Sequence, residues 1–573
     1  MFANFRQAMA WVHTWFGLVL GYVLIAVFFF GSLSVFDREI DRWAVPETRF
    51  AAQPMPSFDT VLKPVYDRLR AHPDDMAATA LRVQGEIPHP DTLPLASLYA
   101  YTTHRDPVLQ IGGEFAIPNK PIDASDDHQH VHGWASIDPR TGAYLSEDKL
   151  QVGSDFFYPL HYSLHLHWKN LGYWIVGLAA LIMLAALVTG VVMHRKLFRE
   201  LFTFRPHKRT QRSVLDLHNL TGVVALPFHF FFAFTGLVIF AGIYFPLSQT
   251  ALEPLAKQHE VLQAERTGLP HEPAGIPAAL ASVDAMVAEA KRRWALRDMP
   301  GEVGSLFIDH IGDENGYVSI YRAGSDQVAL VGQGVHFKAS TGEVLREDPP
   351  LSPVFSVNEF LTGLHLQHFR HWLLRWLYVF GGLAGCVCIA TGFVFFVEKR
   401  KRQLAGQSPA ALVRWVDALA VAAVTGMLVA TSAMLVANRL LPEDLLGRAL
   451  WQERIFWYSW LAALAHAAWR SAPVARGLIS PAWREQCWAY AALAVAAVLL
   501  NWLTTGDHLG KTLAAGYWPV AGVDLCLLAS AGIAVKAAAL LRIREGVRKR
   551  VAEGTAGTAD SSALDTTLEP ARG

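Results

Sequence analysis

Long apolar runs separated by polar segments dominate the pattern of this 573-residue sequence. A membrane-spanning helix needs about 20 mainly apolar residues, and eight stretches approach or exceed that length. They are 11–36, 170–194, 215–245, 372–397, 412–438, 452–470, 485–505 and 518–541. The pattern therefore predicts a membrane all-α helical bundle with about eight transmembrane helices.

The composition supports a membrane protein. Hydrophobic residues make up 52% of the chain and charged residues only 17%, whereas a soluble domain carries about 25% charged residues. The formal net charge of +0 does not by itself show whether the protein binds nucleic acid. We expect membrane lipid and no nucleic acid among the partners. The run 11–36 is too long for a cleaved signal peptide and lacks a small-x-small site before Asp37, which predicts a retained first helix.

Lysine and arginine in the short loops give the orientation. They cluster in the loop 195–213, directly after the fourth apolar run and directly after the eighth. The positive-inside rule assigns such loops to the cytoplasm. Both termini are then expected in the cytoplasm, with two long polar segments, 38–160 and 246–360, on the exterior side. Residues 551–573 are small, polar and acidic, and we expect them to form a disordered cytoplasmic tail.

The first 400 residues contain an internal repeat. His13 precedes Gly31 and His218 precedes Gly236 by the same 18 residues, in the first and third apolar runs. Each repeat unit consists of a helix, an exterior segment and a second helix, and both units start on the inner side. The first four helices are therefore expected to form a parallel internal repeat with a pseudo-twofold axis along the membrane normal.

Three matching segments set the correspondence within the repeat. They are ASIDPRTGAYL with HFKASTGEVL, PLHYSLHLHW with EFLTGLHLQHF, and LVTGVV with IATGFV. The first match predicts equivalent Thr-Gly hairpin turns at 141–142 and 341–342. The second match pairs His165 with His365.

The chain is expected to consist of seven parts. These are 1–37 as transmembrane helix 1, 38–160 as a first exterior α+β domain, 161–245 as helices 2 and 3 with the basic loop 195–213, 246–360 as a second exterior α+β domain, 361–402 as helix 4, 410–545 as an appended four-helix module, and 551–573 as the tail. In each exterior segment, apolar residues at three- and four-residue spacing predict a helix, and strand-like runs such as GYVSIYRA follow. The appended module has no counterpart in the repeat.

Histidines are concentrated at the ends of the first four apolar runs. Ionisable residues in membrane helices are functional candidates by default, and neutral imidazole is a common axial ligand of haem. The candidates near the inner face are His13, His194 and His218. Those near the exterior face are His161, His165 and His167 before the second helix, and His365, His368 and His371 before the fourth. The two groups indicate two haem levels, one near each face.

His229 lies inside the third apolar run and is harder to place. It follows His218 by 11 residues, close to three helical turns, so both imidazoles share one side of the helix about 16 Å apart. At the depth of His229, the second and fourth helices offer Met183 and Cys386 rather than histidine. Either the helices tilt and break, or His229 has an unusual partner, or it is not a ligand.

Several candidates have a second interpretation that the residues leave open. A single histidine at a helix end is more often an interfacial or hydrogen-bonded residue than a ligand, and a proton relay or a transition-metal transporter would use a similar set. Arg375 at the start of the fourth helix would pair with a haem propionate or extend to the headgroups. The alternating His128, His130 and His132 would bind a metal ion, although a solvated histidine-rich loop fits them better.

The chemistry that the sequence lacks also limits its function. Its four cysteines form no Cys-x-x-Cys and no Cys-x-x-Cys-His motif, which argues against c-type haem attachment, a thioredoxin-like site and a disulfide framework. No cytoplasmic loop is long enough for a nucleotide-binding domain, and no GxGxxG follows a strand. Electrons would therefore come from another protein or from a diffusible reductant.

Several long motifs, in order, resemble the PepSY-associated transmembrane family. They are LHYSLHLHWKNLGYWIVGL, TGVVMHRKLFRELFTFRPHKRTQR, LDLHNLTGVVALPFHFFFAFTGL and GLHLQHF…LRWLYVFGGLAGCVCIATG, within roughly residues 8–402. The two exterior segments, each ending in a Thr-Gly turn, look like the PepSY-type domains of that family.

Members of that family in Gram-negative inner membranes include ferrisiderophore reductases with b-type haems between their helices. The resemblance implies an oxidoreductase with two haems b that takes electrons from an unknown cytoplasmic donor and reduces a ferric siderophore or similar ferric chelate in the periplasm. Carried over by motif, the haem ligands are expected among His13, His165, His194, His218, His229 and His365. The alternative is a PepSY-based peptide- or envelope-protein-binding or regulatory module, or a permease, without redox activity.

Overall fold

The computed structural model describes residues 4–71, 95–102, 107–116, 130–145, 151–193, 205, 210–245, 268–270, 272–324, 326–329, 333–403, 410–476 and 478–565. The chain forms two compact units. The helical unit comprises Met1–Ala44, Leu150–Phe234 and Trp376–Gly573. The sheet unit comprises Val45–Lys149 and Thr235–Arg375.

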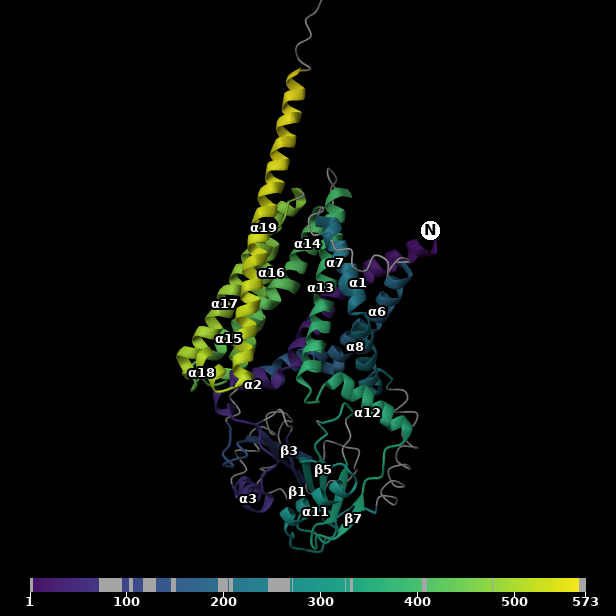
Figure 1. The fold of residues 1–573 in the computed structure, drawn as a ribbon, viewed down its shortest axis with the longest axis vertical. Coiled ribbons are helices and arrows are strands. Elements are labelled where there is room, and N and C mark those ends of the chain that lie inside the picture. The colour runs from purple at the N-terminus through teal and green to yellow at the C-terminus, as the bar shows by residue number, and fades with distance from the viewer. Residues whose placement is uncertain are drawn as a thin grey trace, which may run out of the picture. The chain divides into compact units, whose positions relative to one another are not determined.

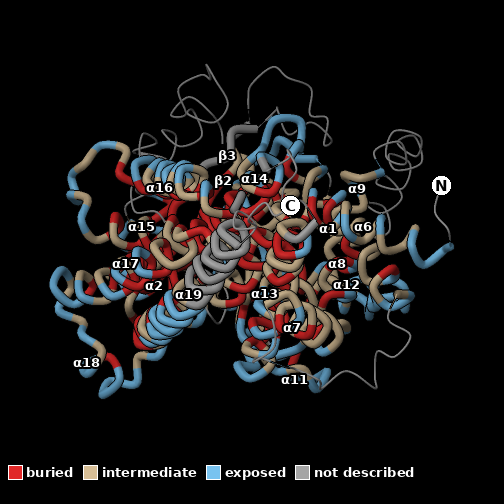
Figure 2. Tube along the Cα trace, turned by 90° about the horizontal axis from the view of Figure 1, so that it is seen from above, coloured by how far each residue is buried: buried red, intermediate tan, exposed pale blue. Residues whose placement is uncertain are grey.

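Long helices, joined by several short ones, build the helical unit (Figure 1). In chain order they are α1 Phe5–Ser34, α2 Asp37–Ala44, η4 Val152–Phe157, α5 Tyr158–Tyr162, α6 Leu171–Met193, α7 Thr210–Val224, α8 Leu226–Ile239, α13 Trp372–Gln403, α14 Ala410–Val421, η6 Ala422–Gly426, α15 Met427–Leu440, α16 Arg448–Arg470, α17 Ala482–Thr505, α18 Leu509–Ala514 and α19 Trp518–Asp565. Figure 2 shows the buried residues gathered between these helices.

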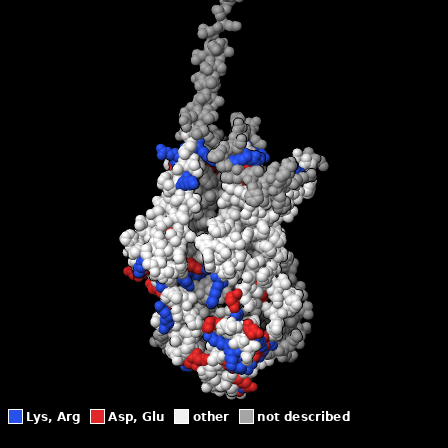
Figure 3. Space-filling model, viewed as in Figure 1, with Lys and Arg blue, Asp and Glu red and all other residues white. Residues whose placement is uncertain are grey.

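Six helices are long and apolar enough to cross a membrane, counted over the residues that the structure describes. They are Phe5–Ser34, Trp168–Met193, Trp372–Lys401, Ala411–Leu440, Ala482–Thr505 and Trp518–Gly546. Few charged side chains lie along the middle of the helical unit on the face shown in Figure 3, and lysine and arginine gather toward one end. The chain is therefore a multi-pass membrane protein.

The count of spans is lower than the eight expected from the apolar runs. Helices α7 and α8 qualify only as a pair, which is bent by 62°. The bend lies beside Pro227, which has no backbone N–H to donate within a helix. The expected span 452–470 forms helix α16, but Glu453, Arg454 and several tryptophan and polar residues leave it less apolar than the six candidate spans.

Helix α1 lies at the centre of the packing of the first helices. Leu24 and Phe28 of α1 are buried against Ala179 and Met183 of α6 and against Ala233 of α8. Lipid tails are as apolar as these side chains. Close van der Waals packing therefore holds the helices together, rather than the hydrophobic effect.

Helix α14 joins the later helices to this core. Val413 and Val416 of α14 pack against Leu18 of α1 and Phe396 of α13. The Tyr22 hydroxyl of α1 also donates a hydrogen bond to the Val416 carbonyl oxygen at 3.3 Å. Helix α14 therefore packs directly against the repeat.

The described residues of the sheet unit form a seven-stranded antiparallel sheet (Figure 1). In spatial order its strands are β3 His130–Ile137, β2 Leu109–Ala116, β1 Leu95–Tyr101, β4 Val303–Asp309, β5 Tyr317–Arg322, β6 Gly334–Lys338 and β7 Val344–Glu347. The two polar segments were expected to fold as separate domains. Instead, β1 and β4 pair, with Tyr99 opposite Phe307, and this pairing closes two strand edges that separate sheets would leave open.

Two helical segments pack against the same face of the sheet. One is η2 Phe58–Leu62, which continues as α3 Lys63–Ala71, and the other is α11 Val283–Leu296. Their apolar side chains share one core with Leu98, Ile308 and other inward residues of the strands. Each polar segment therefore contributes one helical segment and a run of neighbouring strands, β1–β3 from the first and β4–β7 from the second, as the internal repeat predicts.

The N-termini of these two helical segments cap each other. Asp59 accepts a hydrogen bond from the Ser282 hydroxyl at 2.6 Å. Asp284 accepts hydrogen bonds from the Ser57 hydroxyl and, at 2.8 Å, from the Phe58 N–H. Ser-x-Asp occurs at both N-termini, so the symmetry of the repeat extends to individual caps.

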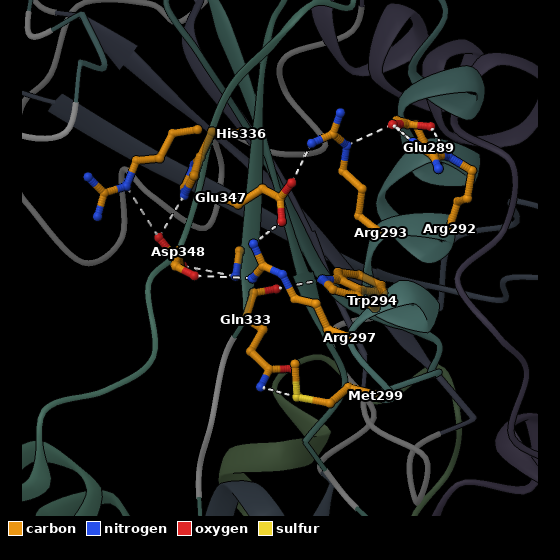
Figure 4. Close-up of polar contacts among 12 residues, drawn as sticks. Glu289, Arg292, Arg293, Trp294, Arg297, Met299, Gln333, His336, Glu347 and Asp348 are labelled. Carbon is orange, nitrogen blue, oxygen red and sulfur yellow. Dashed lines mark hydrogen bonds and ion pairs between the residues drawn. The ribbon is translucent and has the colours of Figure 1, made fainter.

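Helix α11 is also tied to the edge strand β7. Arg293 of α11 and Arg297, the residue that follows this helix, both form ion pairs with Glu347 of β7 (Figure 4). On the same helix, hydrogen bonds from Arg292 and Arg293 lower the pKa of Glu289 to about 2. These contacts fix the helix against the last strand of the sheet.

The predicted Thr-Gly turns are confirmed. Gly142 and Gly342 both have positive φ, 69° and 74°, a conformation that favours glycine. Their N–H groups donate to the carbonyl oxygens of Asp138 and Lys338, in both cases at 2.8 Å. The two halves therefore use the same turn.

Two further helices of the sheet unit lie next to membrane segments in the sequence, α9 Ala241–Tyr244 and α12 Pro353–Leu366. The N-cap of α12 is Ser352, whose side chain accepts a hydrogen bond from the Phe355 N–H, and its C-cap is Gln367, whose φ is 59°. At the other end of the chain, α19 runs to Asp565. Helix therefore extends into the segment 551–573 that was expected to be disordered.

Candidate histidine sites in the membrane helices

His13 lies on α1 and faces α6. Its Nδ1 lies 3.1 Å from the Ala186 carbonyl oxygen and 3.2 Å from Thr189 Oγ1. A Cβ at Gly190 would lie 3.5 Å from His13 Cε1, so only a small residue leaves the ring this close to α6. With its proton on Nδ1, the imidazole donates to the carbonyl, an arrangement that is common in metal-bound histidine because it fixes the tautomer and the ring direction.

His218 is held in the same way by α13. Its Nδ1 lies 2.7 Å from the Cys388 carbonyl oxygen and 3.6 Å from Cys388 Sγ. A Cβ at Gly392 would lie 3.5 Å from His218 Cε1. The match of LVTGVV with IATGFV makes 186 equivalent to 388 and 190 equivalent to 392, so the repeat positions both rings through the same main-chain carbonyl and the same glycine.

The two imidazoles face each other inside the helical unit. The ring centroids of His13 and His218 are 6.2 Å apart, and the rings are nearly perpendicular at 89°. A metal ion bound at about 2 Å by each of two imidazole nitrogens holds their centroids roughly 6 Å apart. The donor type and the centroid separation of this pair are therefore compatible with two histidines on opposite sides of one metal ion.

His229 on α8 is fully buried, with an exposed fraction of 0%. Its ring lies edge-on to Phe28, with centroids 5.3 Å apart. The ring interacts with the backbone of Gly381, but neither nitrogen has an acceptable hydrogen-bond geometry to any group in the described part of the chain. A buried polar group left in that state costs about 1–3 kcal/mol, so a further partner is expected there.

His161 on α5 packs against the far end of α1. Its Nδ1 lies 2.8 Å from the Val27 carbonyl oxygen. A Cβ at Gly31 would lie only 2.6 Å from that nitrogen, so this contact requires glycine. The glycine that the repeat singles out in α1 is thus a contact site for a histidine.

His365 makes the equivalent contact in the second repeat, within the sheet unit. Its Nδ1 lies 2.7 Å from Thr235 Oγ1, and a Cβ at Gly236 would lie 3.2 Å from its Cε1. Gly31 and Gly236 are equivalent positions, so His161 corresponds to His365. The expected pairing of His165 with His365 is therefore shifted by four residues.

His165 lies in a tight turn outside the membrane spans. Both Leu164 and His165 have positive φ, 52° and 54°, and the ring stacks on Phe156 with centroids 4.8 Å apart. Its Nε2 lies 2.9 Å from the Phe156 carbonyl oxygen. Burial lowers the pKa of His165, with a smaller contribution from the charge of His167, so the neutral ring is favoured.

Residues 10–399 match the family described as PepSY-associated TM region. The chain belongs to this family. An uncharacterized protein of Pseudomonas aeruginosa is 28% identical over 404 residues, which cover 67% of this chain and 93% of that protein. The family match ends within α13, so α14 to α19 of this PepSY-associated protein lie outside it.

The remaining candidates that the sequence placed near the exterior face of this PepSY-associated chain lie between α12 and α13 or at the start of α13. The Arg375 N–H donates to the His371 carbonyl oxygen at 3.1 Å, and the Leu374 N–H lies 3.4 Å from His371 Nδ1. The Arg375 side chain is buried, with 6% exposed. His368 lies in the same link. The propionate role of Arg375 stays a prediction.

Several candidates fall outside what the structure describes. His194 and His128 lie outside the described residues. His130 and His132 occupy β3, opposite Ala116 and Glu114, and as alternate residues of one strand they share a face; their side chains are not among the described ones. Within the described residues, no group of three or more His, Cys, Asp or Glu side chains is placed to hold a metal ion.

The sequence interpretation missed the residues that hold the imidazoles. Thr189 and the main chain at Ala186 and Cys388 contact the rings. The Thr-Gly pair in LVTGVV and IATGFV could have indicated these contacts. It was used only to align the repeats, and not to predict that the residues beside it contact the histidines. The thiol contact of Cys388 with His218 had no signal, because a cysteine in an apolar run is usually packing.

Proposed function

We propose that this protein is a haem-dependent transmembrane oxidoreductase of the bacterial inner membrane. Two haems b, one near each face, would pass electrons from a cytoplasmic donor to a ferric siderophore or similar ferric chelate in the periplasm. The observation that supports this best is the His13–His218 pair, whose ring centroids are 6.2 Å apart.

The residues around this pair fit haem. Both Nδ1 atoms face main-chain carbonyls, which raises the basicity of the imidazoles and fixes which nitrogen is available to a metal. Gly190 and Gly392 place no side chain against the rings. Haem iron with such ligands supplies one-electron chemistry, and His13 and His218 would hold and orient it near the cytoplasmic face.

The outer level is assigned to the histidines that contact the repeat glycines. His365 was expected there, and its structural equivalent is His161 rather than His165. Gly31 follows His13 by 18 residues on α1, which corresponds to about 27 Å along a helix. The two levels therefore lie near opposite ends of the same helix, which is the arrangement that transfer across a bilayer requires.

On the periplasmic side, the acceptor would be reduced without covalent chemistry. One electron converts Fe(III) to Fe(II) in the chelate. Hard oxygen donors of siderophores hold Fe(III) far more tightly than Fe(II), so reduction releases the metal. The sheet unit would shape the site of the chelate, and the polar segments of both repeat units contribute to it because they share one sheet.

The alternative functions use no chromophore. A peptide-binding or regulatory module would work through the sheet unit alone. In a permease, α14 to α19, which lie outside the family match, would form part of the transport path. Neither alternative requires His13 and His218 to face each other with equivalent supports, although a metal-free edge-to-face pair falls in the same range of spacing.

Proteoliposomes test the proposal. The protein is reconstituted with a membrane-impermeant reductant trapped inside, and a ferric siderophore with an Fe(II) chelator is added outside. The proposal predicts formation of the coloured Fe(II) complex with the wild type and its loss in His13→Ala. Rates equal to those of protein-free vesicles would reject it in favour of a function without redox activity.

A further inference from the structure

Helix α12 exposes large apolar side chains although it is not one of the candidate spans. Val354 is 79% exposed, Phe355 63%, Val357 58% and Phe360 47%. The helix has 14 residues and is therefore about 21 Å long, too short to cross a hydrocarbon core of about 30 Å. The apolar surface of α12 needs another explanation.

The sequence of α12 is amphipathic. Val354, Val357 and Leu361 follow at three- and four-residue spacing, and Phe360 falls beside them on the same side of the helix. Glu359 falls on the opposite side. Such a pattern is typical of a helix that lies in the plane of the membrane interface with its apolar side toward the acyl chains.

Both ends of α12 are close to membrane segments. At its C-terminal end, His365 contacts Thr235 and Gly236, which belong to the last turns of the apolar helix α8. Six residues after α12 ends, the span Trp372–Lys401 begins. Its first residue, Trp372, is 67% exposed, and tryptophan at the end of a span marks the interface. Helix α12 therefore connects two points at membrane depth.

In the first repeat, the position equivalent to the exposed face of α12 is covered by other helices of the protein. The correspondence of His161 with His365 makes Phe156 equivalent to Phe360. Phe156 is 0% exposed and packs against Phe456 and Trp457 of α16, with centroids 4.9 and 6.3 Å apart. Phe360 is 47% exposed. The appended module thus covers one repeat, and the second repeat must be covered differently.

We propose that α12 lies flat in the headgroup region of the bilayer, with Val354, Val357 and Phe360 turned into the acyl chains. The exposed side chains of Trp372 and Leu373 continue this surface onto a span, whose outer face meets lipid. Helix α12 contains no lysine or arginine, so apolar burial rather than attraction to anionic lipid drives the contact. The bilayer then supports the helix that carries His365.

Labelling from within the lipid tests this directly on the full-length protein. The protein is reconstituted in phosphatidylcholine vesicles that contain a phospholipid with a diazirine near the start of one acyl chain, and the labelled peptides are mapped by mass spectrometry after illumination. Hydroxyl-radical footprinting of the same vesicles reports water access. We expect lipid label on Pro353–Leu366 at a level close to that of α13 and several-fold above that of α11, with little oxidation of Phe360.

Two outcomes would overturn the proposal. Strong oxidation without lipid label would place α12 in water, and absence of both signals would mean that protein covers it. A matched pair of variants sharpens the result: Val357→Asp should lower the label on α12 several-fold, whereas Thr362→Asp, on the side of Glu359, should leave it unchanged. Equal effects of the two variants would contradict the assigned orientation. The experiment needs no haem and no reduction, so it is independent of the proposed function.

Discussion

Replacing Gly31 by alanine should displace His161. The added Cβ would lie 2.6 Å from His161 Nδ1, and ordinary contact begins at 3.4 Å, so the ring must move by about 0.8 Å. That movement breaks the 2.8 Å hydrogen bond to the Val27 carbonyl oxygen. Overpacking costs about 1–3 kcal/mol and the lost hydrogen bond about 0.5–1.5 kcal/mol, so we expect Gly31→Ala to destabilise the protein by roughly 2–4 kcal/mol.

The same substitution elsewhere on the repeat helices provides the comparison. At Gly236 the Cβ would lie 3.2 Å from His365 Cε1, so that ring needs to move by only about 0.2 Å, and the expected loss is below about 1 kcal/mol. At Gly17 a Cβ would meet no atom within 4 Å. Gly17→Ala should therefore be neutral or slightly stabilising, because alanine favours helix by up to about 1 kcal/mol over glycine.

Equilibrium unfolding of the three variants in mixed micelles measures these differences. The expected order of stability is Gly17→Ala, then Gly236→Ala, then Gly31→Ala. A free energy of unfolding for Gly31→Ala equal to that of Gly17→Ala would refute the contact between α1 and His161. It would also remove the basis for treating His161 and His365 as equivalent.

Three further predictions follow from other contacts. Asp59→Ala and Asp284→Ala should each destabilise the sheet unit by about 1–3 kcal/mol, visible as faster hydrogen exchange in α3 and α11; an effect confined to one helix would contradict reciprocal capping. Burial lowers the pKa of His165, so the unfolded chain binds a proton at this residue more readily than the folded protein does. Stability should therefore fall as the pH drops below about 6.5. Thermal midpoints measured between about pH 5.5 and 8 should depend less on pH in His165→Gln than in the wild type. Cys388→Ala removes the thiol but keeps the main-chain carbonyl that contacts His218, so haem content should match the wild type; loss of haem would show that the thiol holds the ring.

The membrane character and the turns were predictable because their physical signals are local. Apolar runs of helical length identify most of the spans without any knowledge of partners. The Thr-Gly turns were predictable because Gly142 and Gly342 are needed where φ is positive. The bend between α7 and α8 had a local signal too, in Pro227, but the apolar run 215–245 continues through it.

The single sheet was not predictable, because periodicity identifies strands but not their partners. Both polar segments contain strand patterns, and these patterns are equally compatible with two separate small sheets. The pairing of β1 with β4 joins residues about 200 positions apart, and no local signal encodes such a contact. The reciprocal caps of Asp59 and Asp284 are equally long-range, although Ser-x-Asp stood at both N-termini.

The histidine sites were predictable by residue type and only partly by position. The repeat correctly placed His13 and His218 in equivalent surroundings. It misaligned the outer histidines because α5 ends at Tyr162 and the chain then turns through positive φ at Leu164 and His165. Alternating histidines in the sequence do not reveal such a turn. The two repeats were therefore aligned by the similar strings HLH and HLQ, and not by the ends of α5 and α12.

The visible spectrum of the purified protein, oxidised and then reduced with dithionite, tests the central claim most directly. The account predicts a Soret shift and an α band of b-type haem in the wild type. In His218→Ala, roughly half of that haem should remain, because the outer level keeps its own ligands. A wild-type protein without a chromophore, or a His218→Ala variant with the full wild-type spectrum, would contradict the account.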